Sequence, residues 1–175
     1  FADAADENGL SALARSFLAG VLELAPDAFP MVASTVNAYR RFAPGSWAPK
    51  TASWAPYNYA AAVRTAAETE AMTRLELRLP GSDVNVYLGL AMMLGAGLDG
   101  IERGLALTAA PISSGGPNEI PADVPRLPGD LTEATRRFKG NPANARLFGA
   151  AFVDHFAMIC EAEDAALRRA VSAAE

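Results

Sequence analysis

The chain has 175 residues, of which 51% are hydrophobic, and its net charge at pH 7 is −5. This length and composition suit one folded domain and exclude a disordered chain, and the acidic balance argues against nucleic acid as a partner. Cys160 is the only cysteine, which excludes a disulfide framework and favours a reducing compartment, so we expect a cytoplasmic protein. We find no signal peptide or lipidation motif and expect no membrane partner.

The first part of the chain reads as one helix followed by a long loop. Apolar residues recur at helical spacing over residues 8–24, which predicts a core helix. The stretch 31–58 contains several prolines, both tryptophans and the adjacent Arg40 and Arg41, so we expect a long ordered loop with room for one strand. Such loops usually carry function. Residues 34–78 hold six basic and three acidic residues, and this local positive balance suggests a site for an anion.

Two short strands are expected next, over residues 60–66 and 73–79. Charged and apolar residues alternate strictly along the second one. Because strand side chains alternate faces, its leucines should enter a core while Arg74, Glu76 and Arg78 form a row on the other face. Arginine forks bind phosphate and carboxylate groups, and a carboxylate is a hard ligand for Mg²⁺ or Mn²⁺. The alternative interpretation is an ordinary half-buried strand whose charges are solvated.

A turn and a long apolar helix follow these strands. Pro80-Gly81 predicts the turn, and Ser82 or Asp83 can cap the helix. Residues 84–105 are apolar on nearly every side, which predicts a helix that is buried all round. The helix is long enough to cross a bilayer, but its polar interruptions and the lack of a basic flank favour a buried helix of a soluble enzyme.

The last third of the chain predicts helices without obvious chemistry. Residues 107–130 contain five prolines and should form an irregular loop. We expect one helix over residues 132–139, capped by Asp130 or Thr132, and another that starts at Asn141-Pro142. A final helix is expected over residues 144–173. Its predicted inner face is made of four residues, namely Phe148, Phe152, Phe156 and Ile159.

Three other features of the final helix complete the sequence reading. Asp164 and Arg168 are spaced to pair on its surface. His155 is the only histidine and has no neighbouring ligand at metal-binding spacing, so we assign it no metal or catalytic role. Cys160 is flanked by apolar residues, which predicts a buried and inert thiol.

Two stretches of the chain match a known pattern. The first runs from Arg74 to Ile101, where R-x-E-x-R-x-P leads into the apolar helix and A-G-L-D-G-I ends the match. The second is TVNAYRRFAPG at residues 35–45, which is similar to the pattern T-V-N-S-Y-K-R-L-x-P-G. Together they resemble the glutamine synthetase family, in the carboxy-terminal part of its catalytic domain. The order of the two motifs and their separation also resemble those of the family.

The resemblance implies both a fold and an activity. It implies an α+β fold in which an antiparallel sheet fragment is packed by long helices, and a single incomplete domain over residues 1–175 that lacks its amino-terminal part. The implied activity is an ATP-dependent ligase that joins the γ-carboxylate of glutamate to ammonia or an organic amine through a γ-glutamyl phosphate. ATP and Mg²⁺ or Mn²⁺ would be required, and the enzyme would be a homo-oligomer.

The resemblance also implies roles for individual residues. Glu76 matches a metal ligand of the family. Arg64 and Arg74 match arginines that bind the phosphates of ATP, and Arg41 and Arg78 match those that hold the carboxylates of glutamate. Arg64 and Arg78 are also the catalytic candidates.

Two positions depart from the family pattern. The pattern W-x-x-D-N-R-x-x-x-x-R is represented here from Trp54 to Arg64, with Tyr59 in place of a phosphate-binding arginine. A tyrosine cannot replace a guanidinium fork. The second departure is Trp47 in S-W-A-P, where the family often has the glutamate of Y-E-A-P, which takes a proton from ammonium. Trp47 is therefore a candidate substrate-binding residue for an organic amine, as in relatives that resemble γ-glutamylpolyamine synthetases; the alternative is that it only packs the loop.

These observations lead to four expectations and one alternative function. Leu75 and Leu77 should be buried, and Glu76 should face an open concave surface. The fragment alone should be inactive and should self-associate through uncovered apolar surface. The alternative function, which the change at Tyr59 supports, is a non-catalytic structural or assembly module of the same family.

Overall fold

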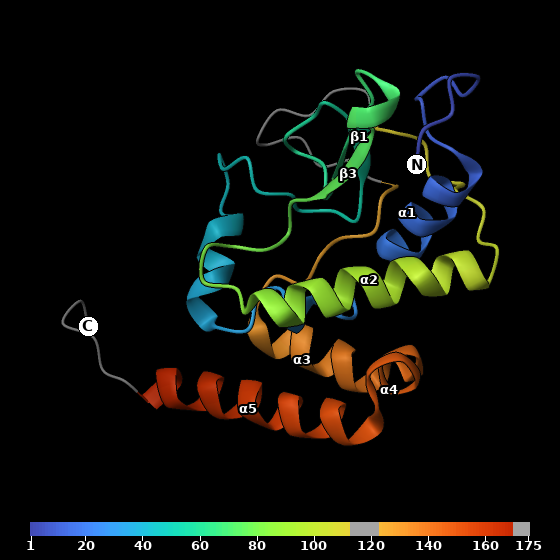
Figure 1. Cartoon of the computed structure of the whole chain (residues 1–175). Helices are drawn as coiled ribbons and strands as arrows, with labels where there is room; N and C mark the ends of the chain where they lie inside the picture. The colour runs from blue at the N-terminus through green and yellow to red at the C-terminus, as the bar shows by residue number, and fades with distance from the viewer. Residues whose placement is uncertain (113–122, 170–175) are drawn as a thin grey trace.

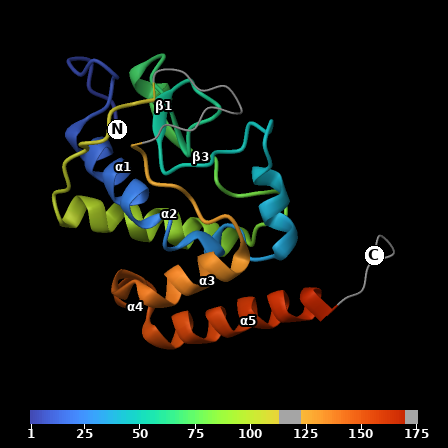
Figure 2. The same ribbon diagram turned by 180° about the vertical axis from the view of Figure 1, so that it is seen from behind.

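The computed structural model describes residues 1–112 and 123–169 of the chain. A small sheet and helix α1 lie on one side of the long helix α2, and helices α3, α4 and α5 lie on the other side (Figure 1). The view from behind shows the same order of layers (Figure 2). The core fills the space between these layers, and its largest fully buried side chains include Trp54, Phe29 and Phe138.

The first helix, α1, spans Ala12–Leu24. It begins later than the predicted residue 8 because the hydroxyl of Ser11 accepts the Ala14 N–H and fixes the cap. The 3-10 helix η1 (Phe29–Met31) follows, and a second 3-10 helix, η2 (Val36–Phe42), begins after Thr35, whose hydroxyl accepts the Ala38 N–H. The predicted long loop thus contains η2 and, as expected, one strand, β1 (Trp54–Pro56).

The sheet has three strands in the order β1-β2-β3, where β2 is Val63–Ala66 and β3 is Arg74–Leu77. The 3-10 helix η3 (Glu70–Met72) connects β2 to β3. These two strands are antiparallel, as predicted, whereas β1 runs parallel to β2, so the sheet is mixed. The α+β class is confirmed.

The leucines of β3 are less buried than predicted. Leu75 and Leu77 are half-buried and pack against the edge of the core, while Leu79, just after the strand, is fully buried. The alternation of faces is correct, because none of the three points into solvent. The prediction of full burial fails for Leu75 and Leu77 because β3 is an edge strand with one neighbour in the described chain.

Helix α2 spans Val86–Glu102. Its cap is Asn85, whose side-chain oxygen accepts the N–H groups of Tyr87 and Leu88, so the prediction of Ser82 or Asp83 was wrong. The prediction of a helix buried all round was also wrong for one face. Five apolar side chains of α2 are more than half exposed: Val86, Tyr87, Leu90, Leu94 and Leu98.

The opposite face of α2 packs tightly against α1. A Cβ built on Gly100 would lie 2.3 Å from the carbonyl oxygen of Ser16, and one built on Gly20 would lie 2.2 Å from that of Ala96. Only glycine at these two positions allows the helix backbones to approach so closely. No helix in residues 1–112 or 123–169 combines the length and the apolar character that spanning a membrane would require.

The carboxy-terminal helices are α3 (Leu131–Gly140), α4 (Pro142–Phe148) and α5 (Ala150–Arg169). Asp130 caps α3 and Asn141 caps α4, as two of the expected cap residues. The final helix begins at Ala150 and not at the predicted residue 144. Gly149 has a φ of +90°, which ends α4 and starts α5 in a new direction.

The side chains of α5 only partly follow the prediction. Phe152 and Phe156 stack with their ring centroids 5.4 Å apart and pack on Phe138, but Phe148 belongs to α4, and Ile159 is 48% exposed. The pairing of Asp164 with Arg168 is confirmed at 2.7 Å. His155 is exposed.

Cys160 is buried, as predicted, and burial raises the pKa of its thiol to about 11. The described parts of the predicted loop 107–130 form no helix or strand apart from an isolated bridge between Thr51 and Arg126. Residues 113–122 lie outside the described part of the chain, as do residues 170–173 of the predicted final helix.

Candidate active site

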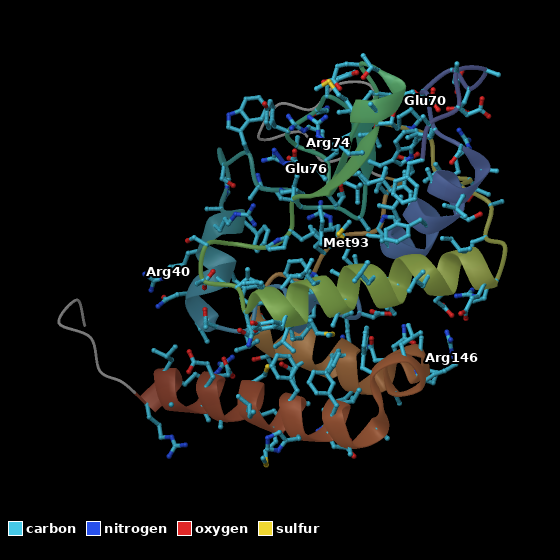
Figure 3. All side chains as sticks on the ribbon, in the orientation of Figure 1. Arg40, Glu70, Arg74, Glu76, Met93 and Arg146 are labelled. Atoms are coloured by element: carbon cyan, nitrogen blue, oxygen red, sulfur yellow. The ribbon has the colours of Figure 1, made fainter. Side chains whose placement is uncertain are left out.

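The antiparallel register of β2 and β3 places Arg64 directly opposite Glu76. Arg64 Nη2 donates to Glu76 Oε2 at 2.5 Å, and Arg78 Nη1 lies 3.7 Å from Glu76 Oε1. Two guanidinium groups thus hold one carboxylate on the charged face of the sheet. Figure 3 shows Glu76 and Arg74 on β3, on the side of α2 where the sheet lies. The predicted row of charges is confirmed as a row, but its members differ in their contacts.

Tyr59 lies over both arginines of this pair. The centroid of its ring is 4.5 Å from Cζ of Arg64 and 4.8 Å from Cζ of Arg78. We refer to Tyr59, Arg64, Glu76 and Arg78 as the arginine cluster. The ring is 54% exposed, so the cluster opens to solvent on this side. Sequence reasoning considered Tyr59 only as the replacement of a phosphate-binding arginine. It missed this stacking, for which the sequence carries no local signal.

The arginine cluster carries a surplus of positive charge and unused donors. The side chains of Arg64 and Arg78 are each 16% exposed, and that of Glu76 is 37% exposed. The Nε atoms of Arg64 and Arg78 are buried and have no hydrogen-bond partner in the described chain. Burial opposes the charge of Arg64, but contact with Glu76 and Tyr59 outweighs it and keeps the pKa of Arg64 above its usual value. Buried charged donors that lack an acceptor suit an anionic ligand.

Arg41 stabilises the backbone next to the arginine cluster. Its two Nη atoms donate to the main-chain carbonyls of Leu79 and Arg78, at 2.6 and 2.7 Å. This contact joins η2 to the end of β3 and fixes the backbone that carries Arg78. Burial, together with the nearby charge of Arg78, lowers the pKa of Arg41. The predicted binding of a glutamate carboxylate by Arg41 stays a prediction.

Arg74 lies at the outer end of the charged row. Its side chain is 47% exposed, lies 3.5 Å from a carboxylate oxygen of Glu68 and donates to the carbonyl of Met72 at 3.0 Å. Both contacts are local and exposed, so they hold Arg74 weakly. Binding of a phosphate group by Arg74 would therefore break only weak contacts.

Trp47 lies in the loop that follows η2, and its side chain is 54% exposed. The next residue back, Ser46, donates its hydroxyl to the carbonyl of Arg41 at 2.7 Å. The loop that carries Trp47 is therefore tied to the residue that fixes Arg78. An indole exposed to this extent contributes little to packing of the loop, which is the alternative role considered for it.

The described residues do not make up a metal site. They contain no group of three histidine, cysteine, aspartate or glutamate side chains close enough to share an ion. Glu76 is the only carboxylate of the arginine cluster, and both of its oxygens contact guanidinium groups. One carboxylate in this state falls short of the coordination that Mg²⁺ needs.

A second charged network was missed by sequence reasoning. Asp99 is 6% exposed in the apolar helix α2, and Arg146 of α4 donates to both of its oxygens at 2.6 and 3.0 Å. Arg103 donates to Asp99 at 3.1 Å and to Glu23 of α1 at 2.6 Å. Figure 3 shows Arg146 well away from Glu76. The network joins three helices, and the signal for it was an aspartate inside an apolar run.

The comparisons with known proteins agree on one family. Residues 1–175 match the family described as the catalytic domain of glutamine synthetase. The type-1 glutamine synthetase 2 of Dictyostelium discoideum is 38% identical over 157 residues, which is 89% of this chain and 30% of that protein. The gamma-glutamylethanolamide synthetase GlnA4 of Streptomyces coelicolor is 36% identical over 168 residues, which is 96% of this chain and 35% of that protein.

A solved structure also matches the fold. The structure titled GmaS/ADP complex superposes with a TM-score of 0.80 and 32% sequence identity, and the match covers 98% of this chain and 40% of that one. The chain therefore spans between 30% and 40% of the length of these relatives.

Proposed function

This chain belongs to the glutamine synthetase family, and on that premise we propose that the protein containing it is an ATP-dependent ligase that joins the γ-carboxylate of glutamate to an amine. The chain is the carboxy-terminal part of its catalytic domain. Since the chain spans only part of the length of its relatives, the activity belongs to the full-length protein, and residues 1–175 alone are expected to be inactive.

The arginine cluster is the observation that carries this proposal. Arg64 and Arg78 are oriented by Glu76 and Tyr59 and retain buried Nε donors without partners. Arg64, with the loosely held Arg74, would bind the phosphates of ATP. Arg78 would bind the carboxylates of glutamate together with Arg41, which donates to the main-chain carbonyl of Arg78.

The proposed reaction requires stabilisation of moving negative charge. The γ-phosphoryl group of ATP passes to the γ-carboxylate of glutamate, and an amine then attacks the resulting acyl phosphate and releases phosphate. Positioned guanidinium groups that face the transferred group lower the barrier of such a step. A divalent cation would neutralise further phosphate charge, but the described residues supply only Glu76 as a ligand, and its role as such stays a prediction.

Trp47 points to an organic amine as the acceptor. Without a carboxylate at this position, ammonium lacks a proton acceptor, and general-base help of this kind is worth about 10²–10⁴ in rate. An indole face attracts an amine cation by about 0.5–2 kcal/mol and can cover an alkyl chain. The similarity to a gamma-glutamylethanolamide synthetase supports this choice.

The test is an acceptor series with the full-length protein. Phosphate release from ATP and glutamate would be measured with ammonium, ethanolamine, putrescine and longer polyamines. We expect kcat/KM to be highest with an alkyl amine. A preference for ammonium would refute the role of Trp47 and leave plain glutamine synthesis as the activity.

Two variants of Trp47 sharpen the series. Trp47→Glu restores a carboxylate and should raise kcat/KM for ammonium relative to the best alkyl amine by about tenfold or more. Trp47→Phe keeps an aromatic face and should keep the preference for the alkyl amine. If both variants retain the wild-type preference, Trp47 does not select the acceptor.

A second candidate function is a non-catalytic module of the same family. The tyrosine at position 59 and the engagement of Glu76 by two arginines favour it. Calorimetry with ADP and Mg²⁺ distinguishes the two, because the ligase must bind the nucleotide and the module need not.

A further inference from the structure

We infer that Tyr59 is a positioning residue, whose ring holds the guanidinium groups of Arg64 and Arg78 together so that both can bind one anionic ligand. The identity of that ligand, a nucleotide phosphate or the carboxylate of glutamate, rests on the proposed function. The positioning itself rests on the geometry of the arginine cluster.

One ring contacts two cations that would otherwise repel each other. The ring centroid lies 4.5 Å from Arg64 Cζ and 4.8 Å from Arg78 Cζ. Glu76 is 2.5 Å from Arg64 but 3.7 Å from Arg78, so the carboxylate holds the second arginine less tightly. The negative face of an aromatic ring attracts both guanidinium groups and offsets their repulsion. Tyr59 therefore adds the contact that Arg78 lacks.

Contact with the face of an aromatic ring still allows a guanidinium group to donate hydrogen bonds. A guanidinium is planar, so it stacks through its face and donates hydrogen bonds through its edge. The Nε atoms of Arg64 and Arg78 are buried and have no acceptor in the described chain. A phosphate or carboxylate group that reaches these edges would satisfy donors that are costly to leave unpaired.

The loop around Tyr59 is fixed well enough for this role. The side-chain oxygen of Asn58 accepts the Ala60 N–H at 2.8 Å. The hydroxyl of Tyr57 accepts the Ala67 N–H at 3.1 Å, and Tyr57 itself has a φ of +53°. Contacts on both sides of Tyr59 thus hold its backbone in place, so that the ring keeps its position over the arginines.

Arginine at position 59 would change the cluster rather than complete it. The cluster has two guanidinium groups and one carboxylate, and a third guanidinium would double its net charge. It would also remove the ring that lies over Arg64 and Arg78 and add a third positive charge beside two that already repel each other. In this chain, Tyr59 thus has a role of its own in the arginine cluster, which an arginine at this position would not fill.

The first test measures the reactivity of the two arginines in the full-length protein without ligand. Phenylglyoxal modifies accessible guanidinium groups, and peptide mass spectrometry gives separate rates for Arg64 and Arg78. Tyr59→Leu should raise both rates about fivefold, the effect expected for the loss of about 1 kcal/mol of stacking, whereas Tyr59→Phe should leave them unchanged. The matched control is Tyr87→Leu, the same change at a ring on α2 that is 82% exposed and is not stacked on a guanidinium in the described chain.

The second test measures ADP binding in the presence of Mg²⁺ by calorimetry. Tyr59→Leu should raise the Kd about tenfold, Tyr59→Phe should stay close to wild type, and Tyr59→Arg should not tighten binding. Rescue by phenylalanine separates stacking from any role of the hydroxyl group.

The two tests fail in different ways. If phenylglyoxal modifies Arg64 and Arg78 at equal rates in Tyr59→Leu and in Tyr87→Leu, or if Tyr59→Arg binds ADP more tightly than wild type, the positioning role is refuted. If Tyr59→Leu raises the modification rates but the wild-type protein binds no ADP, the positioning role stands and the proposed ligase activity falls.

Discussion

Asp99 is the only charged residue that is buried in the part of the chain that the structure describes. Its carboxylate is 6% exposed and accepts hydrogen bonds from Arg146 and Arg103. The hydrogen bond from Arg146 is the main reason that the pKa of Asp99 lies below its usual value, with burial opposing the shift and Arg103 adding to it. The ion pair therefore stabilises the folded state only while Asp99 is ionised.

Asp99→Asn should destabilise the chain in a way that depends on pH. Because the folded pKa is depressed, the contribution of Asp99 is fully present above the unfolded pKa and is lost as pH falls through the folded one. We expect a loss of about 1–3 kcal/mol that is constant above about pH 5 and shrinks below about pH 4. Thermal unfolding of wild type and variant from pH 3 to 8 measures it.

The control for this prediction is Asp164→Asn, which removes a pair on α5 whose arginine is 66% exposed and whose aspartate is 21% exposed. Such pairs contribute about 0.3–0.5 kcal/mol. If the two variants lost equal free energy of unfolding, burial of the Asp99 network would add nothing to stability.

At the residue scale, the sequence predicted which charges share a face but not how they are used. Strand alternation alone placed Glu76 and Arg78 on one face, because the period of two is a property of the backbone. The contact between Arg41 and the carbonyls of Arg78 and Leu79 joins residues 37 and 38 positions apart in the chain. The stacking of Tyr59 depends likewise on the path of its loop, which no spacing rule encodes.

Among the elements, the crossing of α1 and α2 depends on glycine at the contact point. A Cβ on Gly100 would lie 2.3 Å from the Ser16 carbonyl oxygen and 2.9 Å from Gly20 Cα, and backbone atoms cannot move aside as side chains do. Gly100→Ala should therefore force the helices apart and cost about 1–3 kcal/mol of unfolding free energy. Denaturant titration followed by circular dichroism measures the change.

Gly140→Ala is the matched control at the end of α3. A Cβ there would have no heavy atom within 4 Å, and its φ is not in the left-handed region. Alanine should be neutral or stabilising by up to about 1 kcal/mol, because it restricts the unfolded chain. If Gly100→Ala were equally neutral, the helices would not be in the close contact described.

The elements were predictable where their signals are local. Asp130 and Asn141 cap α3 and α4 as the sequence indicated, and the alternating strand became β3. The break at Gly149 was missed because an apolar helical pattern continues across it. The exposed face of α2 was missed for another reason: apolar residues all round a helix do not show which side the present chain covers.

At the scale of the whole molecule, the uncovered side chains of α2 form one apolar stripe along the helix: Val86, Leu90, Leu94 and Leu98. Their spacing of four residues keeps them on one side of the helix. We expect the full-length protein to cover this stripe, and the homo-oligomer implied by the family resemblance stays a prediction.

The isolated chain should self-associate through the stripe. Leu94→Lys should raise the dissociation constant of the assembly about tenfold or more, since burial of one leucine is worth about 1.5–3 kcal/mol. Sedimentation velocity over a range of concentrations measures it. Leu13→Lys is the control, because Leu13 on α1 is 52% exposed but lies outside the stripe. A wild-type chain that stays monomeric at high concentration would contradict the prediction.

Because β3 pairs with β2 in a fixed register, the effect of an insertion in β3 depends on whether the number of inserted residues is odd or even. One residue inserted within β3 ahead of Glu76 would turn the Glu76 carboxylate toward the core and Leu77 toward the charged face of the sheet. Two inserted residues would return each side chain to its own face. The alternation along β3 therefore sets both the side on which its leucines meet the core and the side on which Glu76 joins the arginine cluster, so an insertion that keeps one placement also keeps the other.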